Sequence, residues 1–235
     1  MGEGPGVREF IMAKHLERDL ENLQRDILMM GTAVEEMIGK AIRALQDRDP
    51  PLAREVIDGD AAIDELENHV DEESLKILAL HQPVATDLRR IAAVMLINTD
   101  LERMADLAVD IAERAEVLAT PPFIPVPDPL QRMSDMTTTM VRECLNAFVH
   151  LDARLARRVV RLDDEVDRLN SEIIDELVRS MKRSPDSIEH GLSLFSAVRH
   201  LERIADHATN IAEDVVYLVE GEIVRHRPEA ARDRE

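Results

Sequence analysis

Carboxylate side chains recur at helical spacing along this chain. Glu102, Asp106 and Asp110 follow one another at four-residue steps, and on an α-helix each step turns the side chain by only about 40°. Like charges at this spacing repel by about 0.2–0.5 kcal/mol per pair, so the row does not help an isolated helix to form. Carboxylate and carboxamide oxygens on neighbouring helices are, however, the donors that magnesium, manganese or ferric iron bind. A single row of this kind is more often a solvated face, and a metal site is the alternative interpretation.

Three further rows have the same character. They are Asp60, Asp64, Glu67 and Asp71; Asp163, Asp167 and Asn170; and Glu202, Asp206 and Asn210. Acidic residues are abundant, 48 in 235, and most charged rows on helices are solvated faces. Because the four rows occupy matching positions of a duplicated unit, metal binding is a hypothesis that stands beside the solvated-face interpretation.

Composition limits the classes of function. With 29 Lys and Arg against 48 Asp and Glu, the formal charge is −19, which argues against direct binding of nucleic acid or anionic lipid. Five aromatic residues argue against an all-β fold. The single cysteine, Cys144, excludes an internal disulfide framework and a multi-cysteine zinc site. No apolar run approaches the ~20 residues of a membrane span, and the N-terminus has no signal region, so we expect a cytoplasmic protein without membrane insertion.

Glycine and proline divide the chain into helices that must position these rows. Leu162, Val166, Leu169, Ile173 and Leu177 form one apolar stripe of a 3.6-residue period. The pattern predicts an all-α fold of six helices, at about Val7–Asp47, Pro51–Leu80, Pro83–Ala119, Pro129–Leu151, Asp152–Lys182 and Pro185–Gly221. Five prolines between Thr120 and Pro129 predict a non-helical linker.

The two sides of the linker repeat each other. The segment Leu101–Asp106 reads LERMAD, and 100 residues later Leu201–Asp206 reads LERIAD. This internal duplication predicts two tandem three-helix bundles. The predicted domains are a first bundle at residues 1–119, a Pro-rich linker at 120–129, a second bundle at 130–221 and a charged tail at 222–235.

Three segments resemble the PhoU family of phosphate-signalling regulators. They are His81–Arg89 (HQPVATDLR), Thr99–Asp106 (TDLERMAD) and Leu201–Glu213 (LERIADHATNIAE). The resemblance extends from about Met30 to Gly221. It implies a cytoplasmic negative regulator of phosphate uptake and of the phosphate-starvation response. It further implies two partners, the ATPase subunit of a phosphate ABC transporter and a sensor histidine kinase, and a homodimer.

The same resemblance implies surface metal clusters, of iron or zinc, held by E(D)-x-x-x-D motifs. The ligands it implies are Asp60, Asp64, Glu102, Asp106 and Asp110 in the first half and Asp163, Asp167, Glu202, Asp206 and Asn210 in the second. Three positions depart from the family pattern. Asp110 stands where Asn is frequent, Ala105 replaces a frequent Gly, and His81 stands where Arg is frequent.

Two other classes of function remain alternatives from the sequence. One is a metal-dependent enzyme of the carboxylate-bundle kind, a hydrolase or an oxidase. No histidine lies three residues after a glutamate, so the Glu-x-x-His pair of ferritin-like di-iron bundles is missing. The second is a structural helical protein whose acidic faces are solvated. The absence of a recognisable nucleophile or nucleotide-binding loop favours a regulator that is not an enzyme.

Overall fold

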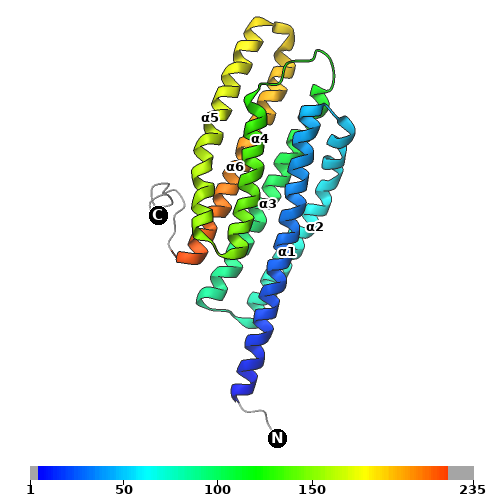
Figure 1. Ribbon diagram of the computed structural model, residues 1–235. Helices are drawn as coiled ribbons and strands as arrows, with labels where there is room; N and C mark the ends of the chain where they lie inside the picture. The colour runs from blue at the N-terminus through cyan, green and yellow to red at the C-terminus, as the bar shows by residue number, and fades with distance from the viewer. Residues whose placement is uncertain (1–4, 222–235) are drawn as a thin grey trace.

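The computed structural model describes residues 5–221, with side chains from residue 14 onward. Within that range the chain forms six long α-helices and no strand (Figure 1). The helices are α1 (Pro5–Asp47), α2 (Pro50–His81), α3 (Ala85–Leu118), α4 (Pro129–His150), α5 (Ala153–Arg183) and α6 (Ile188–Glu220), with a short 3₁₀ turn at Pro185–Ser187. The predicted charged tail at residues 222–235 lies outside the described residues.

Helix starts follow the capping residues. The Asp49 side chain accepts a hydrogen bond from the Leu52 amide at the start of α2, and that of Asp152 accepts from the Arg154 and Leu155 amides at the start of α5. Such caps are worth about 1 kcal/mol each, because they satisfy amides that the helix leaves unpaired.

Two predicted helix starts were early by two and three residues. The third helix begins at Ala85 rather than Pro83, because the extended backbone of Val84 (φ −126°, ψ 159°) precedes it. The sixth begins at Ile188 because Pro185 opens a separate 3₁₀ turn. In both cases the proline lies in the connection, where its fixed φ and missing amide hydrogen cost nothing.

The six helices form two three-helix bundles, which confirms the predicted fold class. Helices α1, α2 and α3 pack on one another, as do α4, α5 and α6. The bundles lie side by side along their length, with their main contact between α3 and α6 and a smaller one between α1 and α4 (Figure 1). Helices α3 and α6 therefore form the centre of the molecule. No helix among residues 5–221 has the length and apolarity needed to cross a membrane.

The predicted linker is non-helical and is held against both bundles. The Arg48 guanidinium donates to the Ile124 carbonyl oxygen at 2.6 Å and lies 4.7 Å from the centre of the Phe123 ring. On the other side, His190 Nε2 lies 3.0 Å from the Thr120 carbonyl oxygen. These contacts fix how the first bundle passes into the second.

The glycines in the first two helices yield a stability prediction. A β-carbon on Gly59 in α2 would meet no atom within 4 Å, whereas one on Gly31 in α1 would lie 2.8 Å from Leu145. Gly59→Ala should therefore raise the free energy of unfolding by about 0.8–1 kcal/mol, the helix-propensity difference. Gly31→Ala should raise the free energy of unfolding by less, because the Leu145 side chain must move to make room for the new methyl group. Denaturant titration of both variants measures the difference, and an equal gain would contradict the packing at Gly31.

Candidate functional site

Helices α2 and α3 bring four predicted ligands of the first half into one acidic cluster. Asp60 and Asp64 come from α2, and Glu102 and Asp106 come from α3. Partial burial raises the pKa of Asp60, and the charges of Asp64 and Asp106 raise it further. Burial also raises the pKa of Glu102, with Asp106 as the next cause. Carboxylates from two helices thus lie close enough to destabilise each other's charge.

Helices α5 and α6 repeat the arrangement in the second half. Burial, followed by the charges of Asp206 and Asp167, raises the pKa of Asp163 to about 7. Burial and then Asp167 raise the pKa of Asp206, and burial and then Asp206 raise that of Glu202. We call these two groups the first acidic cluster (Asp60, Asp64, Glu102, Asp106) and the second acidic cluster (Asp163, Asp167, Glu202, Asp206).

The remaining two predicted ligands lie at the interface between the bundles. Asp110 on α3 has Oδ2 3.6 Å from His200 Nδ1 on α6. Asn210 on α6 donates from Nδ2 to Asp100 Oδ1 on α3 at 3.4 Å. Each therefore interacts with the opposite half of the molecule. A second contact to Asp100, from His207 Nδ1 at 2.8 Å, strengthens this interface.

The sequence analysis missed this interfacial role of Asp100, His200 and His207. A signal for it exists in the duplication, since Asp100 aligns with His200 and Asp110 with Asn210 at the same 100-residue offset. When two related helices pack antiparallel, the beginning of each faces the end of the other. The pairs Asp100–Asn210 and Asp110–His200 are related in this way.

Arginines next to the acidic clusters supply part of the opposing charge. Arg103 lies 3.4 Å from carboxylate oxygens of both Glu102 and Asp106. Arg199 donates to Glu202 Oε1 at 2.9 Å. The side chains of Arg103 and Arg199 are 57% and 44% exposed, so these ion pairs contribute little stability. They do not remove the excess negative charge of either cluster.

The donors of the acidic clusters fit a hard cation by type. In the second acidic cluster, Glu202 Oε2 is buried without a hydrogen-bond donor from the described residues. A buried acceptor of this kind requires a partner, and the cluster donors are all oxygens, as calcium, magnesium and manganese prefer. Within the described part of the chain, however, no group of three or more His, Cys, Asp or Glu side chains is arranged so that it could hold a metal ion. A cation would have to draw the carboxylates together.

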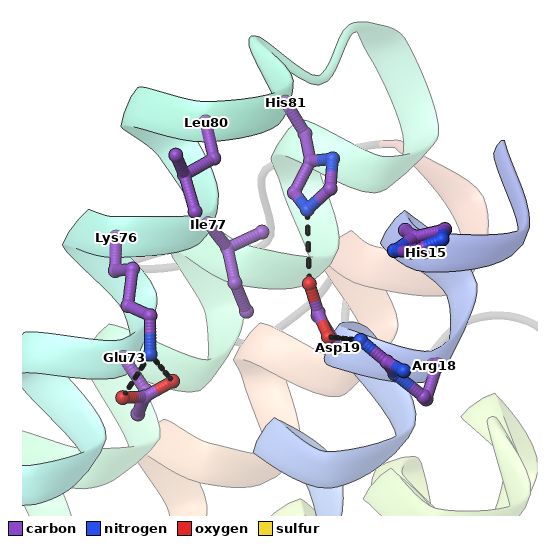
Figure 2. Close-up of a pocket in the computed structure, with 8 residues that line it drawn as sticks. All are labelled: His15, Arg18, Asp19, Glu73, Lys76, Ile77, Leu80 and His81. Carbon is purple, nitrogen blue, oxygen red and sulfur yellow. Dashed lines mark hydrogen bonds and ion pairs between the residues drawn. The ribbon is translucent and has the colours of Figure 1, made fainter. Parts of the chain in front are cut away.

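A cavity of about 560 Å³ opens between α1 and α2, away from the predicted ligands (Figure 2). In it, His81 Nε2 lies 2.9 Å from Asp19 Oδ2, and Lys76 Nζ donates to Glu73 at 2.8 Å. The hydrogen bond with His81 lowers the pKa of the Asp19 carboxyl. Arg18 also lies 3.4 Å from Asp19, so the acidic side chains of the cavity already have basic partners within it.

The fold and its carboxylate clusters define a class, namely all-α proteins made of two related three-helix bundles with an acidic row on each. Comparison with known proteins identifies the family within that class. The PhoU domain matches residues 27–115 and again residues 130–215, one match in each bundle. The chain belongs to the PhoU family.

Individual relatives cover almost the whole chain. The chain is 41% identical over 213 residues, 90% of its length and 96% of the relative's, to a phosphate-specific transport system accessory protein PhoU homolog of Aquifex aeolicus. The same description applies to a Pseudomonas putida protein, 40% identical over 92% of this chain and 84% of its own. Both names describe an accessory protein of a phosphate transport system, which agrees with the predicted regulator and not with the alternative of an enzyme.

Solved structures agree with the sequence comparison. The crystal structure of PhoU from Pseudomonas aeruginosa superposes with a TM-score of 0.84 at 39% identity, covering 88% of this chain and 99% of that one. A phosphate transport system regulatory protein PhoU from Streptococcus pneumoniae also gives 0.84, at 30% identity and with 89% and 99% coverage. The arrangement of the two bundles is therefore that of the family.

Proposed function

We propose that this chain is a cytoplasmic negative regulator of phosphate uptake and of phosphate-starvation signalling. In this role it couples a phosphate ABC transporter, through the ATPase subunit, to a sensor histidine kinase, and it acts as a homodimer. The observation that carries the proposal is that both bundles match the PhoU domain. Relatives named as accessory proteins of phosphate-specific transport systems cover about nine-tenths of the chain.

The acidic clusters support a second part of the proposal, that metal ions take part in this regulator. Asp60, Asp64, Glu102 and Asp106 would hold a cation between α2 and α3, and the second acidic cluster would do the same between α5 and α6. Iron or zinc clusters agree best with the family resemblance, and magnesium or manganese with the all-oxygen donor set. A bound cation would supply positive charge that relieves the repulsion within each cluster.

Asp110 and Asn210 join this set only as secondary candidates. Each is already engaged across the α3–α6 interface, with His200 and Asp100 respectively. Their part in metal binding would require that they exchange these partners for the ion. The four-residue acidic clusters are therefore the core of the proposed metal sites.

Deletion of the gene tests the regulatory role. In cells grown with abundant phosphate, the deletion should raise expression of a phosphate-starvation reporter, because the repressing input to the kinase is lost. Reintroduction of the parent gene should restore repression. The strain should contain no second member of the family. If its reporter is still fully repressed after the deletion, the proposed function is wrong.

A further inference from the structure

Each bundle carries exposed aliphatic side chains on the same side as its acidic cluster. In the first bundle Leu75 on α2 is 57% exposed, and Leu88 and Leu96 on α3 are 46% and 41% exposed. In the second bundle Ile188 and Leu192 on α6 are 44% and 54% exposed. We call these groups the first apolar patch (Leu75, Leu88, Leu96) and the second apolar patch (Ile188, Leu192). Exposed aliphatic residues gathered on one face mark interaction sites more often than single ones do.

Helix geometry places Leu75, Leu88 and Ile188 in line with an acidic cluster, whereas Leu96 is turned by about 80° from Asp106 at the edge of the same exposed face. Leu88 and Asp106 are 18 residues apart on α3, which is five whole turns, so they point in the same direction about 27 Å apart. Ile188 and Asp206 have the same spacing on α6. On α2, Leu75 and Asp64 are 11 residues apart and differ in direction by only about 20°. One face of each bundle is thus apolar at one end and acidic further along.

The two faces are related by an approximate two-fold axis. Contacts Asp100–Asn210 and Asp110–His200 show that α3 and α6 run antiparallel with the duplicated positions exchanged. The apolar patches therefore lie toward opposite ends of the molecule, and the acidic clusters lie between them. A surface with two equivalent sites related in this way matches a partner that itself has two-fold symmetry.

Charge selects the kind of partner. A second copy of this chain would bring acidic clusters against acidic clusters, at −19 per chain, and like charges placed opposite each other oppose binding. A helix with leucine-like side chains at one end and lysine or arginine at the other complements both parts of the face. Amphipathic helices of this kind bind apolar helix grooves through side chains at i, i+4 and similar spacings.

We propose that the face formed by α2, α3, α5 and α6 docks a two-fold-symmetric partner protein, each of whose subunits lays a basic amphipathic helix along one apolar patch and its acidic cluster. This deepens the proposed function and rests on it for the existence of a protein partner. Because metal ions and basic side chains draw on the same carboxylates, the docking belongs to the metal-free protein. The homodimer of the proposed function would use another surface.

The first test is calorimetry with a designed peptide and chelator-treated full-length protein. The probe is a helical peptide of about 20 residues, with leucines at i, i+4 and i+8 and lysines in its last two turns. The parent should bind two peptides per chain, and both Leu88→Gln/Leu96→Gln and Ile188→Gln/Leu192→Gln should bind one. The four-fold variant should bind none.

Controls separate this docking from general attraction to an acidic protein. Met29→Gln changes an equally exposed residue, 53% exposed on α1, and should still bind two peptides. A peptide with glutamate in place of lysine should not bind. Three results would each overturn the proposal. The parent could fail to bind the peptide, the patch variants could still bind two peptides per chain, or the acidic peptide could bind as well as the basic one. All of the substituted positions are exposed, so the variants should fold, and circular dichroism of each variant checks this.

A linked probe tests the two-fold symmetry. Two copies of the peptide joined by a flexible Gly/Ser linker should bind one to one and at least about tenfold tighter than the single peptide, because the second contact becomes intramolecular. No gain in affinity at any linker length would overturn the symmetric partner. Light scattering on the protein alone tests self-association. A parental dimer that Leu88→Gln/Leu96→Gln converts to a monomer would assign the face to a second copy and overturn the proposal.

These outcomes are independent of the test of the proposed function. The gene-deletion experiment measures repression and does not depend on which face docks the partner. If the deletion strain loses repression but the patch variants bind as many peptides as the parent, the proposed function stands and only this surface is rejected.

Discussion

Metal added to chelator-treated protein is expected to raise the free energy of unfolding by about 2.7 kcal/mol for each occupied acidic cluster, at a free concentration 100 times its dissociation constant. Asp106→Asn should remove much of this gain, because a neutral amide oxygen replaces a charged ligand in the first acidic cluster. Asp206→Asn should do the same in the second. The measurement is thermal unfolding of parent and variants, first with chelator and then with iron, zinc, manganese or magnesium in turn.

Without metal, Asp106→Asn should leave the free energy of unfolding unchanged or raise it slightly. Asp106 then raises the pKa of its neighbours Asp60 and Glu102, so its removal relieves repulsion. Against this, Arg103 lies 3.4 Å from Asp106 and loses a weak, exposed ion pair. The two effects leave a net change of about 0 to +0.5 kcal/mol. A metal-dependent reversal of sign distinguishes a ligand from an ordinary surface carboxylate.

A matched control lies on the first bundle itself. Glu65 is an exposed acid next to Asp64 on α2, turned by about 100° from it, and it lies outside the acidic cluster. Glu65→Gln should keep the full metal-dependent gain. If parent, Asp106→Asn and Asp206→Asn all gain equally from every metal, the acidic clusters are solvated faces and the proposed metal sites are wrong.

The fold could be predicted from the sequence because its determinants are local and repeated. Prolines at 50, 51, 83, 129 and 185 mark the connections, and the LERMAD and LERIAD segments reveal the duplication. The packing of the bundles side by side could not be predicted, because apolar periodicity shows which face of a helix is buried and not which helix covers it. The starts of the third and sixth helices were placed too early for a related reason, since a proline fits both the first turn of a helix and the connection before it.

The candidate site was predictable to a similar extent. Four-residue spacing identified Asp60 with Asp64 and Glu102 with Asp106, because such pairs share one helix face whatever the helix packs against. Asp110 and Asn210 share that spacing but lie at the edge of the stripe that turns toward the other bundle. Their partners His200 and Asp100 depend on long-range packing, which no spacing within one helix reports.

Asp163→Asn is expected to stabilise the metal-free protein at pH 8 and to leave it unchanged at pH 4. Burial, then the charges of Asp206 and Asp167, raises the pKa of this carboxyl to about 7 in the folded state, from an ordinary value of 3.8. Between about pH 4 and pH 7 the folded protein therefore holds a proton that the unfolded chain has lost. Stability contributed by this group falls as the pH rises through that window and stays at its low value above pH 7.

The size of this effect is limited by solvent. The full shift of the Asp163 pKa would correspond to about 4 kcal/mol, but the side chain is partly exposed, and screening by water reduces the expected gain to about 1–2 kcal/mol. Denaturant titrations of parent and Asp163→Asn between pH 4 and pH 8, with chelator, measure it. Asp175→Asn, at an exposed position on the same helix, should shift stability by less than about 0.5 kcal/mol at either pH. A parent and an Asp163→Asn variant whose stabilities run parallel from pH 4 to pH 8 would show that this carboxyl has the same pKa in the folded and the unfolded chain. Neither burial nor the charges of Asp206 and Asp167 would then destabilise the ionised form of Asp163 in the second acidic cluster.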